Sequence, residues 1–257
     1  MHPIFLQIGP LTISYYGFMA ACGFLAALAL LNFNRKLADL SSDDASNLIF
    51  IALIGGIIGA RTFYVIQFFD QFRNHLADII RIDKGGLVFY GGFFLAFVSI
   101  LIYCRKKNFD TVRVLDVLVP SLAIGHAFGR IGCFLHGCCF GKPTELFCGV
   151  IYPQGSAPFY RYGATPLHPV QIYESLCNII LAIIAMILLR KSKRGVTMSF
   201  YLISYGLLRF LNEFLRGDHH IRNNNFTIAQ LIGFCILPAG IICLITFLRK
   251  KDNTKHD

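Results

Sequence analysis

Residues 176–189 read LCNIILAIIAMILL, an uncharged run that ends at Arg190 and Lys191. Together with the residues before it, this run reaches about 20 residues, the length that an α-helix needs to cross a hydrocarbon core about 30 Å thick. Similar runs recur along the chain. The expected membrane spans are residues 12–33, 48–69, 85–104, 114–140, 169–189, 196–215 and 226–248. The sequence therefore predicts an all-α integral membrane protein with seven transmembrane helices.

The composition agrees with this fold class. The chain has 257 residues, of which 55% are hydrophobic and only 15% charged, whereas about a quarter of the residues in soluble domains are charged. Its mean hydropathy is +0.59. Because the spans leave no room for a separate soluble domain, residues 1–257 are expected to form a single polytopic membrane domain. The net charge of +10 does not indicate a nucleic-acid partner, since Lys and Arg lie mostly in short connectors rather than among exposed aromatic residues.

Basic residues are distributed unequally between the two sides of the membrane. The N-terminus and the second, fourth and sixth connectors hold seven Lys and Arg residues, whereas the other connectors and the C-terminal tail hold fourteen. Because positively charged connectors stay in the cytoplasm, the N-terminus is expected outside and the C-terminus in the cytoplasm. Residues 1–14 contain no Lys or Arg, so the first span is not expected to be a cleaved signal peptide.

Two outward-facing connectors have recognisable patterns. Residues 141–168 contain four prolines and several aromatic residues, which predicts an ordered loop or small periplasmic head between spans four and five rather than a helix. Residues 71–84 alternate apolar and charged side chains, a pattern typical of a short helix that lies at the membrane interface.

Six charged side chains lie within the expected spans: Arg61, Asp116, Arg130, Glu174, Arg209 and Glu213. Insertion into the centre of a bilayer costs about 2.5–3.5 kcal/mol per charge, so such residues usually face a partner, water or a substrate. Asp116 lies near the cytoplasmic end beside Arg113, and we expect these two to form a snorkelling pair at the surface. The topology brings the other five, together with Tyr16 and Tyr90, to the outer half of the membrane.

The buried charges allow two interpretations. One is a structural Arg–Glu network that clamps helices together. Two glutamates, however, do not neutralise three arginines, and the excess positive charge favours an anionic ligand, since guanidinium groups bind phosphate with two hydrogen bonds. A phosphate-bearing ligand at the depth of the outer leaflet is a phospholipid.

Residues 125–141, GHAFGRIGCFLHGCCFG, form the densest group of motif residues in the chain. Five glycines in seventeen residues, after Pro120, make a regular helix unexpected over the whole stretch. Irregular backbone at membrane depth is tolerated only beside a cavity or other protein, so this region is expected to line the site. Gly125 and Gly129, like Gly55 and Gly59, have the spacing that allows close helix packing.

This stretch resembles the signature of the bacterial prolipoprotein diacylglyceryl transferases in residues 129–137, GRIGCFLHG, and the resemblance extends over nearly the whole chain. Further matching motifs are SYYG at 14–17, GAR at 59–61 followed by Tyr64, GGLVFYGG at 85–92, HPVQIYE at 168–174 and YGLLRFLNEFLR at 205–216. The family is described as seven-spanning with an outward N-terminus, in agreement with the distribution of basic residues.

The resemblance implies a multi-pass enzyme of the bacterial inner membrane. Such an enzyme moves the diacylglyceryl group of phosphatidylglycerol to the lipobox cysteine of a preprolipoprotein signal peptide and releases glycerol phosphate. This is the first step of lipoprotein maturation. The residues expected to be catalytic are Arg130, Arg209, Tyr90 and Glu213. The residues expected to contact substrate are Tyr16, Arg61, Cys133, Gly141, His168, Gln171, Glu174 and Arg216. Neither a metal nor an organic cofactor is expected.

Three positions depart from the family pattern. Tyr90 stands where the family usually has His, Cys133 where it has Asn, and Cys138 where it has an acidic residue. Tyr has an ordinary pKa near 10 and is a poorer base than His. The group that accepts the thiol proton is therefore open, and the chain is either a divergent transferase or a paralogue that uses the same lipid site on another acceptor.

Four of the nine cysteines cluster on the outward side, where oxidising conditions favour disulfides. A bond from Cys138 or Cys139 to Cys148 is the structural expectation. Two rival functions stay open. One is a membrane thiol oxidoreductase or metal site that uses these cysteines with His126 and His136, although it lacks a Cys-x-x-Cys motif. The other is a lipid transporter without catalysis, although no repeat of the spans is evident.

Overall fold

The computed structural model describes residues 4–9, 11–73, 75–81, 85–218 and 226–249. The chain divides into two compact units. Unit 1 comprises Met1–Leu31 and Leu115–Asp257, and unit 2 comprises Asn32–Val114.

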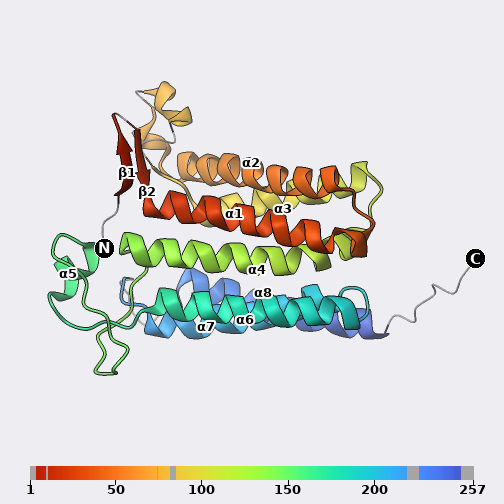
Figure 1. Cartoon of the computed structure of the whole chain (residues 1–257). Coiled ribbons are helices and arrows are strands. Elements are labelled where there is room, and N and C mark those ends of the chain that lie inside the picture. The colour runs from red at the N-terminus through yellow and green to blue at the C-terminus, as the bar shows by residue number, and fades with distance from the viewer. Residues whose placement is uncertain (1–3, 10, 74, 82–84, 219–225, 250–257) are drawn as a thin grey trace, which may run out of the picture. The chain divides into compact units, whose positions relative to one another are not determined.

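Long helices dominate both units (Figure 1). They are α1 (Tyr15–Asn34), α2 (Ser42–Gln67), α3 (Phe89–Lys106), α4 (Thr111–His136), α6 (Val170–Lys191), α7 (Val196–Leu215) and α8 (Ile228–Arg249). The shorter elements are β1 (Ile4–Ile8), β2 (Leu11–Ser14), α5 (Ala157–Tyr162) and the 3-10 turns η1 (Arg35–Ala38), η2 (Phe69–Gln71) and η3 (Leu76–Ile80). Every expected span thus coincides with a helix.

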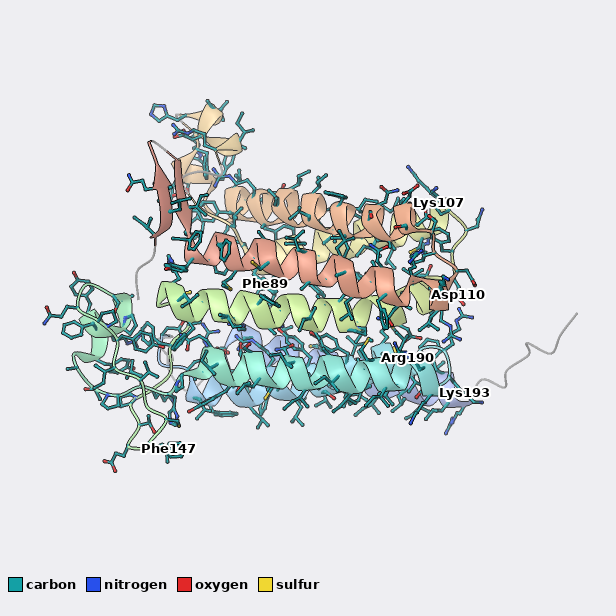
Figure 2. The ribbon with its side chains drawn as sticks, in the orientation of Figure 1. Phe89, Lys107, Asp110, Phe147, Arg190 and Lys193 are labelled. Atoms are coloured by element: carbon teal, nitrogen blue, oxygen red, sulfur yellow. The ribbon has the colours of Figure 1, made fainter. Side chains whose placement is uncertain are left out.

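Six of the described helices are long and apolar enough to cross a membrane, which confirms an integral membrane protein built of helices. The helix outside this group is α7, which has 20 residues and carries Arg209 and Glu213 in its second half. In unit 1, Figure 2 shows Phe147 at one end of the helices and Arg190 and Lys193 at the other.

Four expectations about backbone conformation need correction. Residues 12–14 are not helical but belong to β2, which pairs antiparallel with β1 before α1 begins at Tyr15. The interfacial helix expected at 71–84 is instead the pair of 3-10 turns η2 and η3, and residues 82–84 lie outside the described part of the chain. The connector 141–168 contains the one-and-a-half-turn helix α5.

The fourth correction concerns the glycine-rich stretch, because α4 stays regular up to His136. Gly132 packs against Tyr16 and Met19 of α1, and Gly23 of α1 packs against Gly125. The glycines here allow close contact between two helices rather than breaking one. Helical geometry ends only at Gly137, whose φ of +81° suits glycine.

Unit 2 is built around the packing of α2 on α3. A Cβ atom at Gly55 would lie 3.1 Å from Ser99 Oγ, and one at Gly59 would overlap the backbone of Gly91. Both glycines therefore serve close helix packing, as their spacing predicts. Arg61 donates hydrogen bonds to four backbone carbonyls, those of Asp78, Ile79, Gly85 and Gly86, at 2.5–3.0 Å. It fastens the segment that follows α2 to that helix.

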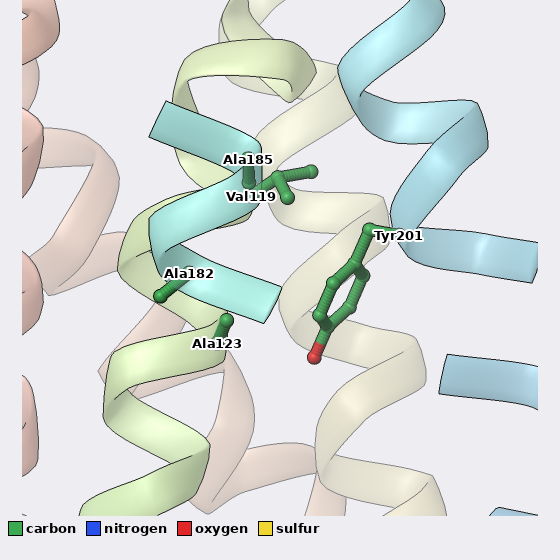
Figure 3. Close-up of a cluster of buried hydrophobic side chains, with 5 residues drawn as sticks. All are labelled: Val119, Ala123, Ala182, Ala185 and Tyr201. Carbon is green, nitrogen blue, oxygen red and sulfur yellow. The ribbon is translucent and has the colours of Figure 1, made fainter. Parts of the chain in front are cut away.

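The core of unit 1 lies where α4, α6 and α7 meet. Figure 3 shows Tyr201 of α7 facing Val119 and Ala123 of α4 and Ala182 and Ala185 of α6. Small residues on two helices leave room for one large ring, a combination that fills the space without strain.

Asp116 is buried in unit 1 rather than exposed in a surface pair. Its carboxylate accepts hydrogen bonds from the backbone N–H groups of Gly195 and Met198 at 2.6 and 2.8 Å. It thus caps the N-terminus of α7, where a negative charge also favours the helix dipole. The expected pair with Arg113 was wrong because spacing along one helix does not reveal a helix end packed against it.

Candidate active site

A buried ion-pair network joins three helices of unit 1. Glu174 of α6 lies between Arg130 of α4 and Arg209 of α7: its Oε2 contacts Arg130 Nε, and its Oε1 is 3.5 Å from Arg209 Nη1. Arg209 Nη2 is in turn 2.9 Å from Oε2 of Glu213, one turn further along α7. The sequence predicts these four residues within a larger group that also contains Arg61, and the structure brings the four together.

Arg130 is the least saturated member of the network. Its Nε also donates to Nε2 of His126 at 3.2 Å. Within the described residues, neither of its two terminal Nη atoms donates a hydrogen bond. The side chain is 14% exposed. Four N–H donors of a buried guanidinium therefore stay available to an anion.

Arg216 forms a second ion pair at the end of α7. Its guanidinium makes two parallel hydrogen bonds to Asp218, at 2.9 and 2.6 Å. Burial alone lowers the pKa of Arg216, but the hydrogen bonds that it donates to Asp218 and the negative charges around it together raise the pKa, so the group stays charged. Its backbone is bridged to Gly141. A Cβ atom on Gly141 would overlap His168, so only glycine fits there.

The charge balance in unit 1 differs from the sequence expectation. Among the described residues, the three arginines Arg130, Arg209 and Arg216 contact three carboxylates, those of Glu174, Glu213 and Asp218, and Arg216 Nε also lies 4.0 Å from Glu213 Oε2. The third intramembrane arginine of the sequence argument, Arg61, belongs to unit 2, where carbonyl oxygens surround its charge. The reason to expect an anionic ligand is therefore the set of free donors on Arg130 and not an excess of positive charge.

Gln171 is an internal support rather than an exposed contact for substrate. Its side chain is 1% exposed, and its Nε2 donates to the carbonyl of Cys138 at 2.7 Å. The hydroxyl of Tyr152 donates to the Gln171 Oε1 at 3.3 Å, and burial raises the pKa of Tyr152 to about 12. These contacts join the first turn of α6 to the chain that leaves α4.

Three cysteines gather where α4 ends. The sulfur atoms of Cys133, Cys138 and Cys139 all lie within 4.8 Å of one another. The thiol of Cys138 donates to the carbonyl of Cys133 at 3.7 Å, which holds it against the last turn of α4.

The disulfide expected to Cys148 is not formed, since all nine cysteines are free. Cys148 Sγ lies 3.1 Å from the hydroxyl of Tyr173, which is also 3.4 Å from Nδ1 of His168. The described contact of the His168 side chain is therefore with Tyr173, in the first turn of α6, and not with the ion-pair network. Of the histidines in the rival metal-site interpretation, His126 is engaged with Arg130, and neither it nor His136 belongs to the thiol cluster.

The remaining site candidates are Tyr16, Tyr90 and Arg61, which lie on α1, α3 and α2. Tyr16 begins α1 in unit 1, is 45% exposed, and interacts electrostatically with the three cysteines and Arg130. Tyr90, on the first turn of α3, and Arg61 belong to unit 2. Tyr90 is 37% exposed and its ring packs edge-on against Phe89.

Sequence reasoning missed several polar contacts of this region. Asp218 follows Arg216 by two residues, a spacing that gives no sign of an ion pair unless the chain turns there. His126 lies four residues before Arg130 on α4, so helical spacing could have found their contact. Asn178 Oδ1 and Asn212 Nδ2 are buried on α6 and α7 without a hydrogen-bond partner in the described part of the chain.

Known proteins with similar sequences belong to one enzyme family. A family model described as prolipoprotein diacylglyceryl transferase matches residues 3–246. A phosphatidylglycerol–prolipoprotein diacylglyceryl transferase of Clostridium tetani is 38% identical over 242 residues, which cover 94% of this chain and 96% of that protein. Enzymes of the same name from Clostridium botulinum and Finegoldia magna are 32% and 30% identical and cover 98% and 100% of this chain and 99% of their own length.

Proposed function

The chain belongs to the prolipoprotein diacylglyceryl transferase family, and from this premise we propose that it transfers the diacylglyceryl group of phosphatidylglycerol to the lipobox cysteine of preprolipoproteins. It is a transferase and a multi-pass protein of the bacterial inner membrane. The reaction is the first step of lipoprotein maturation. Its partners are the lipid and the signal peptide that carries the lipobox.

In this proposal the chain crosses the membrane seven times. The helix α7 joins the six apolar helices as the sixth span in chain order, since 20 residues at 1.5 Å per residue reach about 30 Å. Its two charges are neutralised by pairing, which lowers the cost of burying them. The N-terminus lies outside and the C-terminus in the cytoplasm, in accordance with the greater number of basic residues in the odd-numbered connectors and the tail. The connector with α5 is then periplasmic.

One observation carries the proposal: Nε of Arg130 contacts Glu174 and His126, while its terminal nitrogens donate no hydrogen bond among the described residues and can bind an anion. Displacement of glycerol phosphate from carbon builds negative charge on the leaving phosphate. Donors that are already oriented in a dry site stabilise that charge without reorganising. We assign the phosphate to the Nη atoms of Arg130. Arg209, held between Glu174 and Glu213, keeps Glu174 in line and adds positive potential.

The other candidate residues take supporting roles in this proposal. Arg216 and Gly141 hold together the chain ends that leave α4 and α7. Gln171 fixes the backbone at Cys138. Tyr16 of unit 1 contacts substrate, Tyr90 of unit 2 is a second candidate for such contact, and Arg61 orders the segment between α2 and α3.

The test uses purified protein, phosphatidylglycerol labelled in the diacylglycerol part, and a lipobox peptide with its Cys→Ser counterpart as control. We expect a diacylglyceryl mass gain only on the cysteine peptide. Arg130→Lys keeps the charge but replaces a planar fork with a point charge. It should lower kcat/KM by roughly 10²–10³, the usual effect of losing an oriented donor to the transition state.

The matched control is Arg194→Lys, the same exchange at an exposed site beyond α6, which should leave the rate unchanged. Full activity of a folded Arg130→Lys protein would contradict the role of Arg130. Wild-type protein that binds phosphatidylglycerol but leaves the peptide unmodified would contradict the proposed acceptor and point to a paralogue with another one.

A further inference from the structure

The thiols of Cys133, Cys138 and Cys139 form a compact cluster that the ion-pair network does not use. Their sulfur atoms lie within 4.8 Å of one another, close enough to coordinate one metal ion. Among the described residues, no His, Asp or Glu completes the group with a fourth ligand. Zinc sites with three protein ligands keep the fourth position for water or substrate, whereas structural zinc sites are closed by four.

The backbone holds this cluster in place from both sides. The N–H groups of Gly137 and Cys138 return to the carbonyl of Cys133, which folds the chain back over the last turn of α4. Gln171 fixes the carbonyl of Cys138 at 2.7 Å. Cys139 adopts a φ of +59°, a strained conformation for any residue with a side chain. Strain of this kind persists where surrounding contacts enforce a particular side-chain position, which is characteristic of functional sites.

The cluster also lies beside the proposed phosphate-binding residue. Cys139 interacts electrostatically with both Arg130 and Arg216, and Cys133 with Arg130. Zinc bound to four thiolates carries an excess of negative charge, and neighbouring guanidinium groups stabilise it. An acceptor sulfur held by the metal would therefore be near the guanidinium that takes the leaving phosphate.

We propose that Cys133, Cys138 and Cys139 bind one Zn²⁺ whose fourth position takes the acceptor thiol and activates it for alkylation. This inference rests on the proposed function, because its acceptor is a cysteine thiol. It departs from the sequence expectation that no metal takes part. Coordination to the metal would also remove the proton from the acceptor thiol, so that Tyr90 need not act as a strong base.

The proposed step is an alkylation of the acceptor sulfur with glycerol phosphate as the leaving group. The acceptor thiol coordinates Zn²⁺ in place of water and loses its proton, as coordinated thiols do. The sulfur lone pair attacks the terminal glyceryl carbon of phosphatidylglycerol, the C–S bond forms, and the C–O bond to phosphate breaks with its electron pair moving to oxygen. The released proton ends on the glycerol phosphate. The thioether product is a weak zinc ligand and leaves.

The experiment begins with the metal itself. Protein purified in detergent under reducing conditions is assayed for metals by mass spectrometry, and we expect about one zinc per chain. Cys139→Ser should lose most of it, whereas Cys235→Ser, which removes an exposed thiol on α8, should keep it. Melting temperature in detergent shows that both variants are folded. Absence of zinc from the folded wild-type protein, or copper in its place, overturns the proposal.

A second measurement tests the open position independently of turnover. Co²⁺ replaces the zinc and gives a sulfur-to-metal charge-transfer absorption. Without lipid, the lipobox peptide should increase this absorption by about a third as a fourth sulfur joins three, while its Cys→Ser counterpart should not. No change with the cysteine peptide overturns thiol activation even if the metal is bound.

The pH profile of transfer separates this inference from the proposed function. A zinc-bound thiolate should keep the wild-type rate nearly constant between about pH 6 and 8, whereas a free thiol of pKa about 8.5 loses roughly tenfold per pH unit. Transfer by metal-free protein at the full rate would leave the proposed function intact and overturn the zinc site. Zinc and peptide binding without transfer would support the metal site and contradict the proposed function.

Discussion

Glu174→Gln is the sharpest test of the ion-pair network, because this substitution removes a charge and leaves the side-chain volume almost unchanged. Glu174 is 3% exposed and is the carboxylate between Arg130 and Arg209. At an effective dielectric constant of about 20, its attraction to Arg209 at 3.5 Å is about 5 kcal/mol before desolvation. Arg209 retains Glu213, but Arg130 has no other carboxylate among its described contacts. We therefore expect a loss of about 3–5 kcal/mol, the usual cost of leaving one partner of a buried pair uncompensated.

The assay is thermal unfolding in detergent, followed with a thiol-reactive dye that reports the exposure of buried cysteines such as Cys104. For a chain of this size, the expected loss corresponds to a decrease in Tm of roughly 6–20 °C. Glu145→Gln, at an exposed position in the connector, is the matched control and should shift Tm little. Arg130→Gln combined with Glu174→Gln should recover part of the loss, because both charges are then gone. An unchanged Tm in Glu174→Gln would refute the network as a structural clamp.

Three further changes test the supports of the site. Gln171→Leu removes the donor to the carbonyl of Cys138; it should cost about 1–3 kcal/mol and speed up modification of this thiol, which mass spectrometry of labelled peptides measures. Gly141→Ala forces a methyl group into His168 and should cost about 1–3 kcal/mol in thermal unfolding, whereas Gly56→Ala, with open space around it, should not destabilise. Asp116→Ala removes two hydrogen bonds to backbone N–H groups at the start of α7 and should lower the free energy of unfolding by about 3 kcal/mol. Hydrogen exchange measures this change, and equal protection of α7 in the variant and the wild type would contradict the cap.

The helices were predictable because one physical requirement determines them. A chain that crosses a bilayer must satisfy its backbone hydrogen bonds internally, so each apolar run of about 20 residues becomes a helix. This explains the agreement for α2, α6 and α8. The same requirement explains the error at 125–141. Inside a membrane, helical geometry is retained at glycines that would weaken it in water, and α4 continues to His136.

The site was predictable where helical spacing determines it and unpredictable where chain reversals do. Arg209 and Glu213 are separated by one turn of α7, so their ion pair follows from the sequence. Asp218 pairs with Arg216 only because the chain turns after α7. The thiol cluster likewise depends on the fold-back at Gly137, since Cys138 and Cys139 belong to no helix. Asp116 depends on contact between two helices, which a single sequence does not show.

The balanced charges of unit 1 bear on how the lipid is recognised. An excess of buried positive charge would attract any anion, and its burial would cost stability in the absence of one. A guanidinium that is paired through Nε avoids that cost, because Glu174 compensates the charge of Arg130 while its terminal nitrogens donate no hydrogen bond among the described residues. Selection then depends on hydrogen-bond geometry more than on net charge, and a phosphate oxygen in the plane of the guanidinium satisfies it best. We therefore expect phosphatidylglycerol binding to depend only weakly on ionic strength, since buried, paired groups are screened far less than exposed ones.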